Sequence, residues 1–115
     1  MAGIWNDGGD YAVSIVLSGG YADDEDTISS ILYTGQGGRD PTTGLQVRDQ
    51  ELTRGNKGLY NSMRLEYPVR VIRGYQVKHG PSSGYRYDGL YKVTQAIVER
   101  SIHGPLIWRF RMVEY

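Results

Sequence analysis

The sequence contains no cysteine, so neither a disulfide framework nor a thiolate metal site is available to it. It has no apolar run close to the roughly 18 residues of a membrane-spanning helix, and its first residues lack the basic flank and apolar stretch of a signal peptide. Histidine is scarce too, because His79 and His103 stand alone, without a second ligand at metal spacing. We therefore expect a soluble, intracellular protein with no metal, no cofactor and no catalytic activity of its own.

One sign of charge is missing from the start of the chain. Residues 1–26 contain six acids and no lysine or arginine, so the remainder carries all 13 bases against seven acids, and the net charge is zero. A neutral total argues against a general polyanion binder. The bases alternate with aromatic residues in RVIRGY, GYRYDGLYK and IWRFRM, which suits phosphate contacts beside stacking surfaces. The same pattern suits strands with solvated outer faces, and both interpretations stay open.

The apolar pattern predicts a mainly β protein of the α+β class. At 115 residues the chain is long enough for one domain with a single core. Alternating residues and short apolar runs predict at least five strands, at 13–17, 31–33, 68–75, 91–99 and 105–114. Helical spacing in LTRGNKGLYNSMRLEY, after a cap at Asn56, predicts one helix of about ten residues. The long loops 35–48 and 78–86 are expected to face a partner.

The stretch SGGYADDEDTISSILYTGQGGRD, from Ser18 to Asp40, has the composition of a binding site rather than of a core. Its glycines allow a backbone to approach a ligand closely, its tyrosines offer flat faces, and its four consecutive acids offer hydrogen-bond acceptors. Calcium is disfavoured because the acids lack the spacing of an EF-hand loop, and the glycines match neither a dinucleotide-binding loop nor a Walker loop. The stretch predicts a pocket for a flat, polar group that donates hydrogen bonds.

Four segments in this order, SGGYADDED, YTGQGGRD, DQELTRGN and RYDGLYKV, resemble the motifs of the SET- and RING-associated (SRA) domain, also called the YDG domain. The resemblance runs from about Ala2 to Tyr115. It implies a PUA-like, twisted and open β-barrel with one or two short helices packed outside. It also implies binding of double-stranded DNA that carries 5-methylcytosine, with the modified base flipped into a pocket. In the YDG element itself we expect a structural role, with Asp88-Gly89 forming a turn and Tyr87 packing.

The resemblance assigns the pocket to the stretch singled out above. Tyr21 and Tyr33 would sandwich the flipped base, and Asp24 would accept a hydrogen bond from its exocyclic amine, which favours cytosine over thymine. The whole assigned pocket is Ser18, Gly19, Gly20, Tyr21, Asp24, Tyr33, Thr34 and Gly35. A buried methyl group contributes only roughly 0.8 kcal/mol, so contact alone should favour 5-methylcytosine over cytosine by a few fold. Hydroxymethylcytosine stays open as a ligand.

The residues after the pocket are assigned to contacts with the DNA backbone or groove, namely Gln36, Arg39 and Arg48. Gln36 either inserts into the duplex or braces its loop, and Arg39 either contacts a phosphate or pairs with Asp40. The loop PTTGLQVR, from Pro41 to Arg48, is shorter than in vertebrate members and lacks their Asn-Lys-Arg element. The strand and loop that precede the equivalent of Ala2 in the family are also absent, so we expect a fragment or a minimal form whose open sheet edge invites self-association.

Three functions are compatible with these observations. The first is a non-catalytic DNA-binding module that reads a modified cytosine by base flipping. The second is the recognition part of a modification-dependent restriction endonuclease, whose HNH-type nuclease lies elsewhere or is supplied by a partner. The third is a β domain for protein contacts; a chromatin-modifying partner domain is also compatible. For the first two we expect the protein to be located with DNA, in the nucleus of a eukaryote or the nucleoid of a bacterium.

Overall fold

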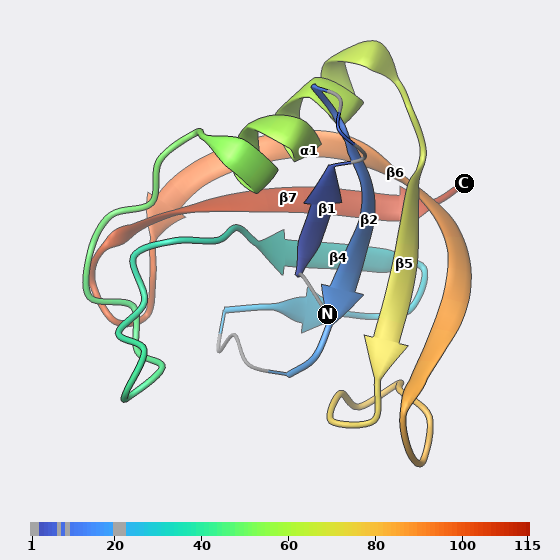
Figure 1. The fold of residues 1–115 in the computed structure, drawn as a ribbon, viewed down its shortest axis with the longest axis horizontal. Helices are drawn as coiled ribbons and strands as arrows, with labels where there is room; N and C mark the ends of the chain where they lie inside the picture. Colours follow the sequence, from blue (N-terminus) through green and yellow to red (C-terminus); the bar gives the residue numbers. More distant parts are fainter. Residues whose placement is uncertain (1–2, 7, 9, 20–22) are drawn as a thin grey trace.

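The computed structural model describes residues 3–6, 8, 10–19 and 23–115 (Figure 1). The elements in chain order are β1 (Ile4–Asn6), β2 (Ala12–Leu17), β3 (Glu25–Asp26), β4 (Ser30–Thr34), α1 (Arg54–Leu65), β5 (Val69–Gly74), β6 (Tyr85–Arg100) and β7 (Leu106–Glu114). Four of the predicted strands are therefore confirmed as β2, β4, β5 and β7. Helix α1 is neither long nor apolar enough to cross a membrane, and it is the one helix in the described part of the chain.

The strands form one seven-stranded sheet in the order β1-β2-β5-β6-β7-β4-β3. Neighbouring strands are antiparallel except β2 and β5, which run parallel. The long strand β6 curves around the molecule and pairs with β5 along one part and with β7 along another (Figure 1). The mainly β prediction is confirmed, but "barrel" overstates the closure. The short strands β1 and β3 end the pairing series and do not pair with each other in the described residues, so the sheet stays open.

Strand β6 begins earlier than the alternation predicted, at Tyr85, because the expected turn at Asp88-Gly89 is a β-bulge. The register shifts between the pair Arg70–Leu90 and the pair Ile72–Tyr87. At this point two residues of β6 face one residue of β5. Gly89 adopts φ 98, a conformation that favours glycine. The prediction that Tyr87 packs is also wrong, since its side chain is 56% exposed. A bulge replaces the turn because both flanking segments continue along β5.

Helix α1 packs across the sheet against β1, β2, β6 and β7. Its N-cap is Thr53, not Asn56 as predicted, because Asn56 lies inside the first turn and is 1% exposed. The glycines of this segment allow a close approach to the sheet. A Cβ at Gly58 would lie 2.3 Å from Asn6 Oδ1. The helix ends at Glu66, whose backbone is left-handed and whose N–H bonds to Met63 O.

The core lies between the inner face of the curved sheet and α1. Its buried members come from every long element, and they are Ile15, Ile31, Leu59, Val69, Val71, Tyr91, Phe110 and Met112 among others. Period-two alternation in β5 directs Val69 and Val71 inward and Arg70 outward. The same alternation directs Arg73 inward, where only 1% of it is exposed. The core therefore fixes the ends of β2, β4 and β5, from which the loops of the candidate site emerge.

Candidate nucleic-acid interface

Asp24 is the central acid of the candidate site. It lies just before β3, and its Oδ1 accepts a hydrogen bond of 2.6 Å from the backbone N–H of Thr34, at the end of β4. Burial raises the pKa of Asp24 to about 6, although the Thr34 N–H and the nearby Arg109 oppose that rise. One oxygen is thus held by the fold. The other remains for a ligand that donates a hydrogen bond.

The Thr34 hydroxyl is a second unsatisfied group at this place. Thr34 is 2% exposed, and its Oγ1 lies against the Asp24 carboxylate without meeting hydrogen-bond geometry. Among the described residues this buried oxygen has no hydrogen-bond partner. Buried hydroxyls are nearly always paired. The orphaned oxygen therefore fits a site in which a polar ligand completes the hydrogen bonding.

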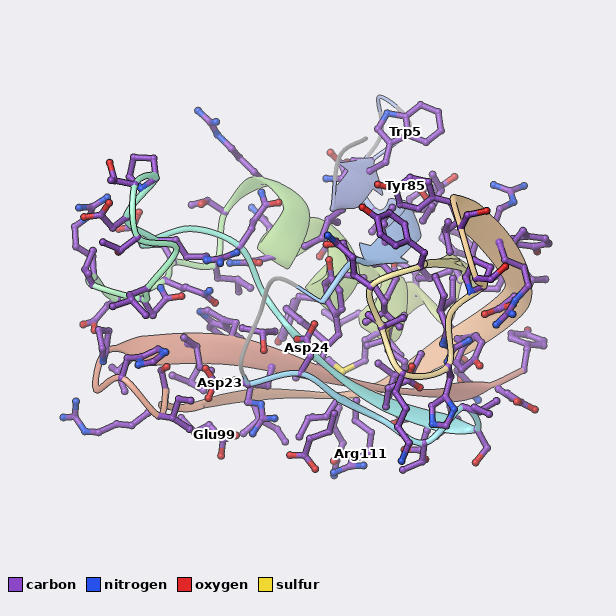
Figure 2. All side chains as sticks on the ribbon, turned by 90° about the horizontal axis from the view of Figure 1, so that it is seen from below. Trp5, Asp23, Asp24, Tyr85, Glu99 and Arg111 are labelled. Atoms are coloured by element: carbon purple, nitrogen blue, oxygen red, sulfur yellow. The ribbon has the colours of Figure 1, made fainter. Side chains whose placement is uncertain are left out.

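Asp24 differs from the three acids next to it in the chain, of which Asp23 is labelled beside it in Figure 2. Asp23 accepts hydrogen bonds from the Ser101 hydroxyl at 2.9 Å and from the backbone N–H of the residue after Ser101. It therefore ties the chain before β3 to the β6–β7 turn. Glu25 is exposed and pairs with Arg109 at 3.1 Å. Asp26 is ion-paired with the buried Arg73 at 2.8 Å. Of the four acids, Asp24 alone lacks both an ion pair and a hydrogen bond to a distant turn within the described part of the chain, and the N–H and hydroxyl of Thr34 lie against its carboxylate.

A cavity of about 350 Å³ opens in front of Asp24, lined by Leu17, Gly19, Asp24, Asp26, Gln76, Val77 and Lys78. Its volume lies at the lower end of the range of ligand pockets, roughly 300–1,000 Å³. Two predicted pocket residues, Gly19 and Asp24, meet here. Gly19 is needed because its φ is 80 and a Cβ would lie 3.1 Å from Gln76 O. Ser18 adjoins Gly19 in the chain, and Gly20 and Tyr21 lie outside the described residues.

The opposite wall of this cavity, from Gln76 to Lys78, was not assigned from the sequence. It belongs to the connection between β5 and β6. The length of the 78–86 loop was the available signal, and it pointed to a partner without naming residues. Lys78 adds an exposed cation at the rim, so the cavity combines a carboxylate with a group suited to phosphate.

Tyr33 is placed deeper than the stacking role requires. It is 2% exposed and belongs to the core. Its hydroxyl donates to Gly3 O at 3.1 Å and lies 3.5 Å from Val16 O, so the ring is held in one orientation. The cavity in front of Asp24 does not include Tyr33 among its lining residues. Stacking on Tyr33 therefore requires that the side chains covering its ring move aside.

The loop from Gly35 to Gln50 is held by three buried amide side chains that sequence reasoning missed. Asn56 binds both backbone groups of Gln36, with Nδ2 donating to O at 3.0 Å and Oδ1 accepting from N at 2.8 Å. Gln50 Nε2 donates to Gly35 O at 2.7 Å, and Gln46 Nε2 donates to the next glycine along the loop. A Cβ at Gly35 would lie 2.5 Å from Asn56 Oδ1, which explains the glycine. Gln36 is thus presented on a fixed backbone.

A second cavity, of about 520 Å³, lies between this loop and the start of α1, with Gln36, Gly37, Gly38, Arg48, Asp49, Gln50, Glu51, Thr53 and Arg54 around it. Of the predicted DNA contacts, Gln36 and Arg48 meet here. Arg39 does not line it, and its Nε donates to Gly44 O at 2.8 Å inside its own loop. Asp40 accepts hydrogen bonds from the backbone N–H groups of the two threonines that follow Pro41. Both residues of the Arg39-Asp40 pair therefore shape the loop.

The charge pattern read from the sequence divides into two groups. Arg73 and Arg109 are bound to carboxylates, so they are not available to phosphate. Arg48, Arg54 and Lys78 are exposed and line the two cavities. Within the described ranges, no cluster of three or more histidine and acidic side chains has the arrangement of a metal site.

Comparisons with known proteins identify relatives across the whole chain. The sequence profile of the SAD/SRA domain matches residues 1–115. The H3 lysine-9 specific histone-lysine N-methyltransferase SUVH4 of Arabidopsis thaliana is 42% identical over 103 residues, which cover 88% of this chain and 16% of that protein. The chain thus spans less than a fifth of the length of this relative. The resemblance drawn from the four sequence motifs is confirmed.

Solved structures agree with this match. The structure of the modification-dependent TagI restriction endonuclease is 46% identical with a TM-score of 0.92, covering 99% of this chain and 42% of that chain. The SUVH5 SRA domain bound to fully methylated CG DNA is 42% identical with a TM-score of 0.78, covering 100% and 74% respectively. The same domain has been solved on fully hydroxymethylated CG DNA.

Proposed function

Since the chain belongs to the SAD/SRA domain family, we propose that it is a DNA-binding module that holds a flipped, modified cytosine at Asp24 and performs no chemistry on it. 5-Methylcytosine is the first candidate for this base. Support comes from relatives that were solved with methylated and hydroxymethylated DNA. The observation that carries the proposal is the Asp24 carboxylate, which is anchored on one side by Thr34 N–H and open on the other to a cavity.

The chemistry of this cavity matches the edge of cytosine. The free oxygen of Asp24 accepts from the N4 amine, which only cytosine among the pyrimidines presents, while the O4 of thymine would face the carboxylate as an unpaired acceptor. The orphaned hydroxyl of Thr34 supplies a further polar partner. Extruding a base costs a few kcal/mol, which these hydrogen bonds and aromatic stacking have to offset. We assign the stacking faces to Tyr21 and to Tyr33, whose buried ring has to be uncovered when the base enters.

The cations and the Gln36 loop complete the interface. We assign the phosphates on either side of the flipped nucleotide to Lys78, which lines the Asp24 cavity, and to Arg48, which lines the second cavity with Gln36. Gln36, on a backbone fixed by Asn56, enters the space that the base leaves. Ser18, Gly20 and Gly35 contribute backbone to the pocket, and Arg39 acts by shaping its loop.

An anisotropy titration tests this proposal. Three matched duplexes, carrying cytosine, 5-methylcytosine or 5-hydroxymethylcytosine at one position, are titrated at one stated salt concentration. We expect tighter binding of the modified duplexes by a few fold or more, and Asp24→Ala should abolish that preference while its circular dichroism spectrum is unchanged. Equal dissociation constants for all three duplexes with the unaltered chain would overturn the proposal.

A second candidate function is recognition within a modification-dependent restriction endonuclease. The observation that favours it is the TagI structure, which has the higher identity and TM-score of the two compared above and of which this chain covers 42%. In that case the nuclease lies outside this chain, and the protein acts at the nucleoid; a chromatin-modifying relative would act in the nucleus. The full-length gene product, incubated with methylated and unmethylated plasmid, should cut only the methylated one. Intact methylated plasmid, under conditions where binding is seen, would eliminate this candidate.

A further inference from the structure

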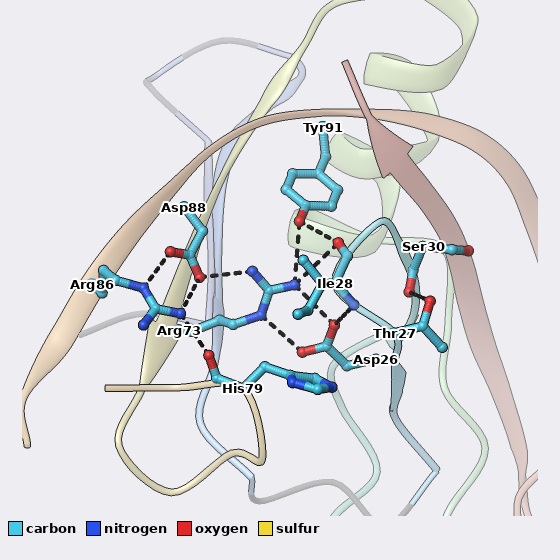
Figure 3. A network of polar contacts seen from close by, with 9 residues as sticks. All are labelled: Asp26, Thr27, Ile28, Ser30, Arg73, His79, Arg86, Asp88 and Tyr91. Atoms are coloured by element: carbon cyan, nitrogen blue, oxygen red, sulfur yellow. Dashed lines mark hydrogen bonds and ion pairs between the residues drawn. The ribbon is translucent and has the colours of Figure 1, made fainter. Parts of the chain in front are cut away.

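Arg73 is the largest fully buried side chain of the molecule's described part, and it lies between two acids (Figure 3). Its Nε and Nη2 donate to the two oxygens of Asp26, each at 2.8 Å, in a bidentate pair. Its Nη1 donates to Asp88 at 2.7 Å. Arg73 is 1% exposed, and a charge buried to this extent persists only when it is paired and hydrogen-bonded.

This network is joined to the Asp24 cavity at two points. Asp26 lines the cavity together with Asp24. Arg73 itself pairs with Leu17, another lining residue, in the parallel ladder of β2 and β5. The proposed function uses none of these contacts.

The network also fixes the turn that follows Asp26. Ile28 has φ 73, an unfavourable conformation for a β-branched residue. Its N–H donates to Asp26 Oδ1 at 2.8 Å, and its carbonyl accepts from the Tyr91 hydroxyl and from Arg73. Strained backbone of this kind persists when the surroundings determine it from several sides. The chain that carries Asp24 is therefore fixed from β5 and β6.

The two acids of the network differ in what they would lose without Arg73. Asp88 has a second cation, Arg86, at its other oxygen. Asp26 has Arg73 as its one ion-pair partner among the described residues, and His79 acts on it through space. The pairing with Arg73 holds the pKa of Asp26 below its ordinary value against the effect of burial. Removal of Arg73 would therefore leave an uncompensated carboxylate in the wall of the cavity.

We propose that Arg73 is a positioning residue of the base pocket, which removes Asp26 from the cavity's chemistry by pairing with it and so leaves Asp24 as its one unpaired carboxylate. This inference rests on the proposed function for its biological meaning. Two charged acids in one cavity would repel the DNA phosphates and compete for the same amine. One acid gives a single acceptor in a defined place. Asp88, from the YDG element, supports Arg73 from the far side.

The first test needs no DNA. The Thr34 amide donates to Asp24, so its proton shift in an NMR pH titration reports the ionisation of Asp24. Other charges act on that carboxylate too: Asp23 and Arg109 through space, and Lys78 at the rim. In Arg73→Met the inflection should move to higher pH by about half a unit or more, because a like charge is added. In Arg73→Met combined with Asp26→Asn it should return to the unaltered position.

Two single variants keep this test decisive even if Arg73→Met does not fold. Asp26→Asn retains the oxygen that binds Ile28 N–H but leaves Arg73 with one carboxylate, so the Asp24 inflection should move to lower pH. Arg86→Met is the matched control, since it removes a cation from Asp88 but not from Asp26, and the inflection should stay in place. An unchanged inflection in Asp26→Asn, or an equal shift in Arg86→Met, would overturn the inference.

The second test uses matched duplexes with and without the modified cytosine. Arg73→Met should reduce the preference between them, a few fold or more in the unaltered chain, to equality, and the double variant should recover it. If the unaltered chain shows no preference, the proposed function fails while the titration still decides the role of Arg73. If the titration behaves as expected but the double variant does not recover the preference, neutralisation of Asp26 is not what sets selectivity, and the inference is overturned.

Discussion

The segment from Asp24 to Ile28 and the loop from Gly35 to Gln50 are both held by side chains from distant parts of the chain, but with different chemistry. The first is fixed by a buried ion network around Arg73. The second is fixed by neutral amides, in particular those of Asn56 and Gln50, which bind backbone groups. An ionic support responds to pH and to the loss of one partner, whereas an amide support responds to neither pH nor neighbouring charge. The segment that contains Asp24 is thus the region that responds to pH and charge, and the Gln36 loop is the region that does not.

Removing the ionic support should have the largest effect. Arg73→Met leaves Asp26 half-buried and unpaired, and since breaking a buried pair costs about 3 to 5 kcal/mol of unfolding free energy, we expect a loss near the lower end of that range. Urea unfolding followed by tryptophan fluorescence measures it. Arg86→Met, at an exposed cation of the same network, should cost far less, because water screens an exposed ion pair. Equal losses of unfolding free energy in the two variants would show that the pair of Arg73 with Asp26 stabilises the fold no more than the exposed pair does.

Removing the amide support should have the next largest effect. Asn56→Ala leaves the backbone N–H and C=O of Gln36 without partners, at a cost of about 2 to 3 kcal/mol. The affinity for modified and unmodified duplexes should fall together, because the loop loses its fixed position. Asn61→Ala is the control on the same helix, where the amide binds an exposed carbonyl of Asp10. A selective loss for the modified duplex alone would contradict the division between the two regions.

The pH dependence of stability sharpens the comparison further. The pKa of Asp24 is raised to about 6 in the folded chain from an ordinary value of 3.8. Its burial therefore costs stability that is absent below about pH 4, grows as the pH rises to about 6, and is constant above. Asp24→Asn should stabilise the chain by about 1 to 2 kcal/mol at pH 7.5 and leave it unchanged at pH 4. Thermal unfolding at the two pH values is the measurement, and an equal gain at both would exclude the carboxylate as its source.

The pH dependence of DNA binding should be the smallest of these effects. It should again depend on Asp24 and not on the Gln36 loop. As the pH falls from 7 to 5, protonation of Asp24 removes the acceptor for the cytosine amine, and the preference for the modified duplex should decline by about tenfold at most. Asp24→Asn should show no such decline, and its amide should instead favour thymine, whose O4 accepts. The amides that hold the Gln36 loop bind backbone N–H and C=O groups, which do not titrate. A decline of equal size in Asp24→Asn would point to another group.

The sequence predicted the strands and the family well because both depend on local patterns. It failed where a residue has two readings that only distant contacts separate. Asn56 looked like a helix cap but binds the loop of Gln36. Asp88-Gly89 looked like a turn but forms a bulge, since the partner strand continues on both sides.

The burial of Arg73 is the clearest feature that the sequence did not predict. Alternation placed it on the same inward face as Val69 and Val71, yet its charge favoured a solvated or phosphate-binding role. The acids that make its burial possible lie far away in the chain. The buried amides Gln46 and Gln50 escaped notice for the same reason. Their partners are backbone groups, which carry no signature in the sequence.

The opposite wall of the Asp24 cavity, from Gln76 to Lys78, lies in a connection outside the sheet. Connections of this kind accept insertions and substitutions far more readily than strands do. Under the proposed function, the acid that accepts from the amine and the wall that contacts the rest of the base can therefore evolve separately. Exchange of this one connection between relatives is a route to domains that accept bulkier cytosine modifications while the reading of cytosine itself is inherited unchanged.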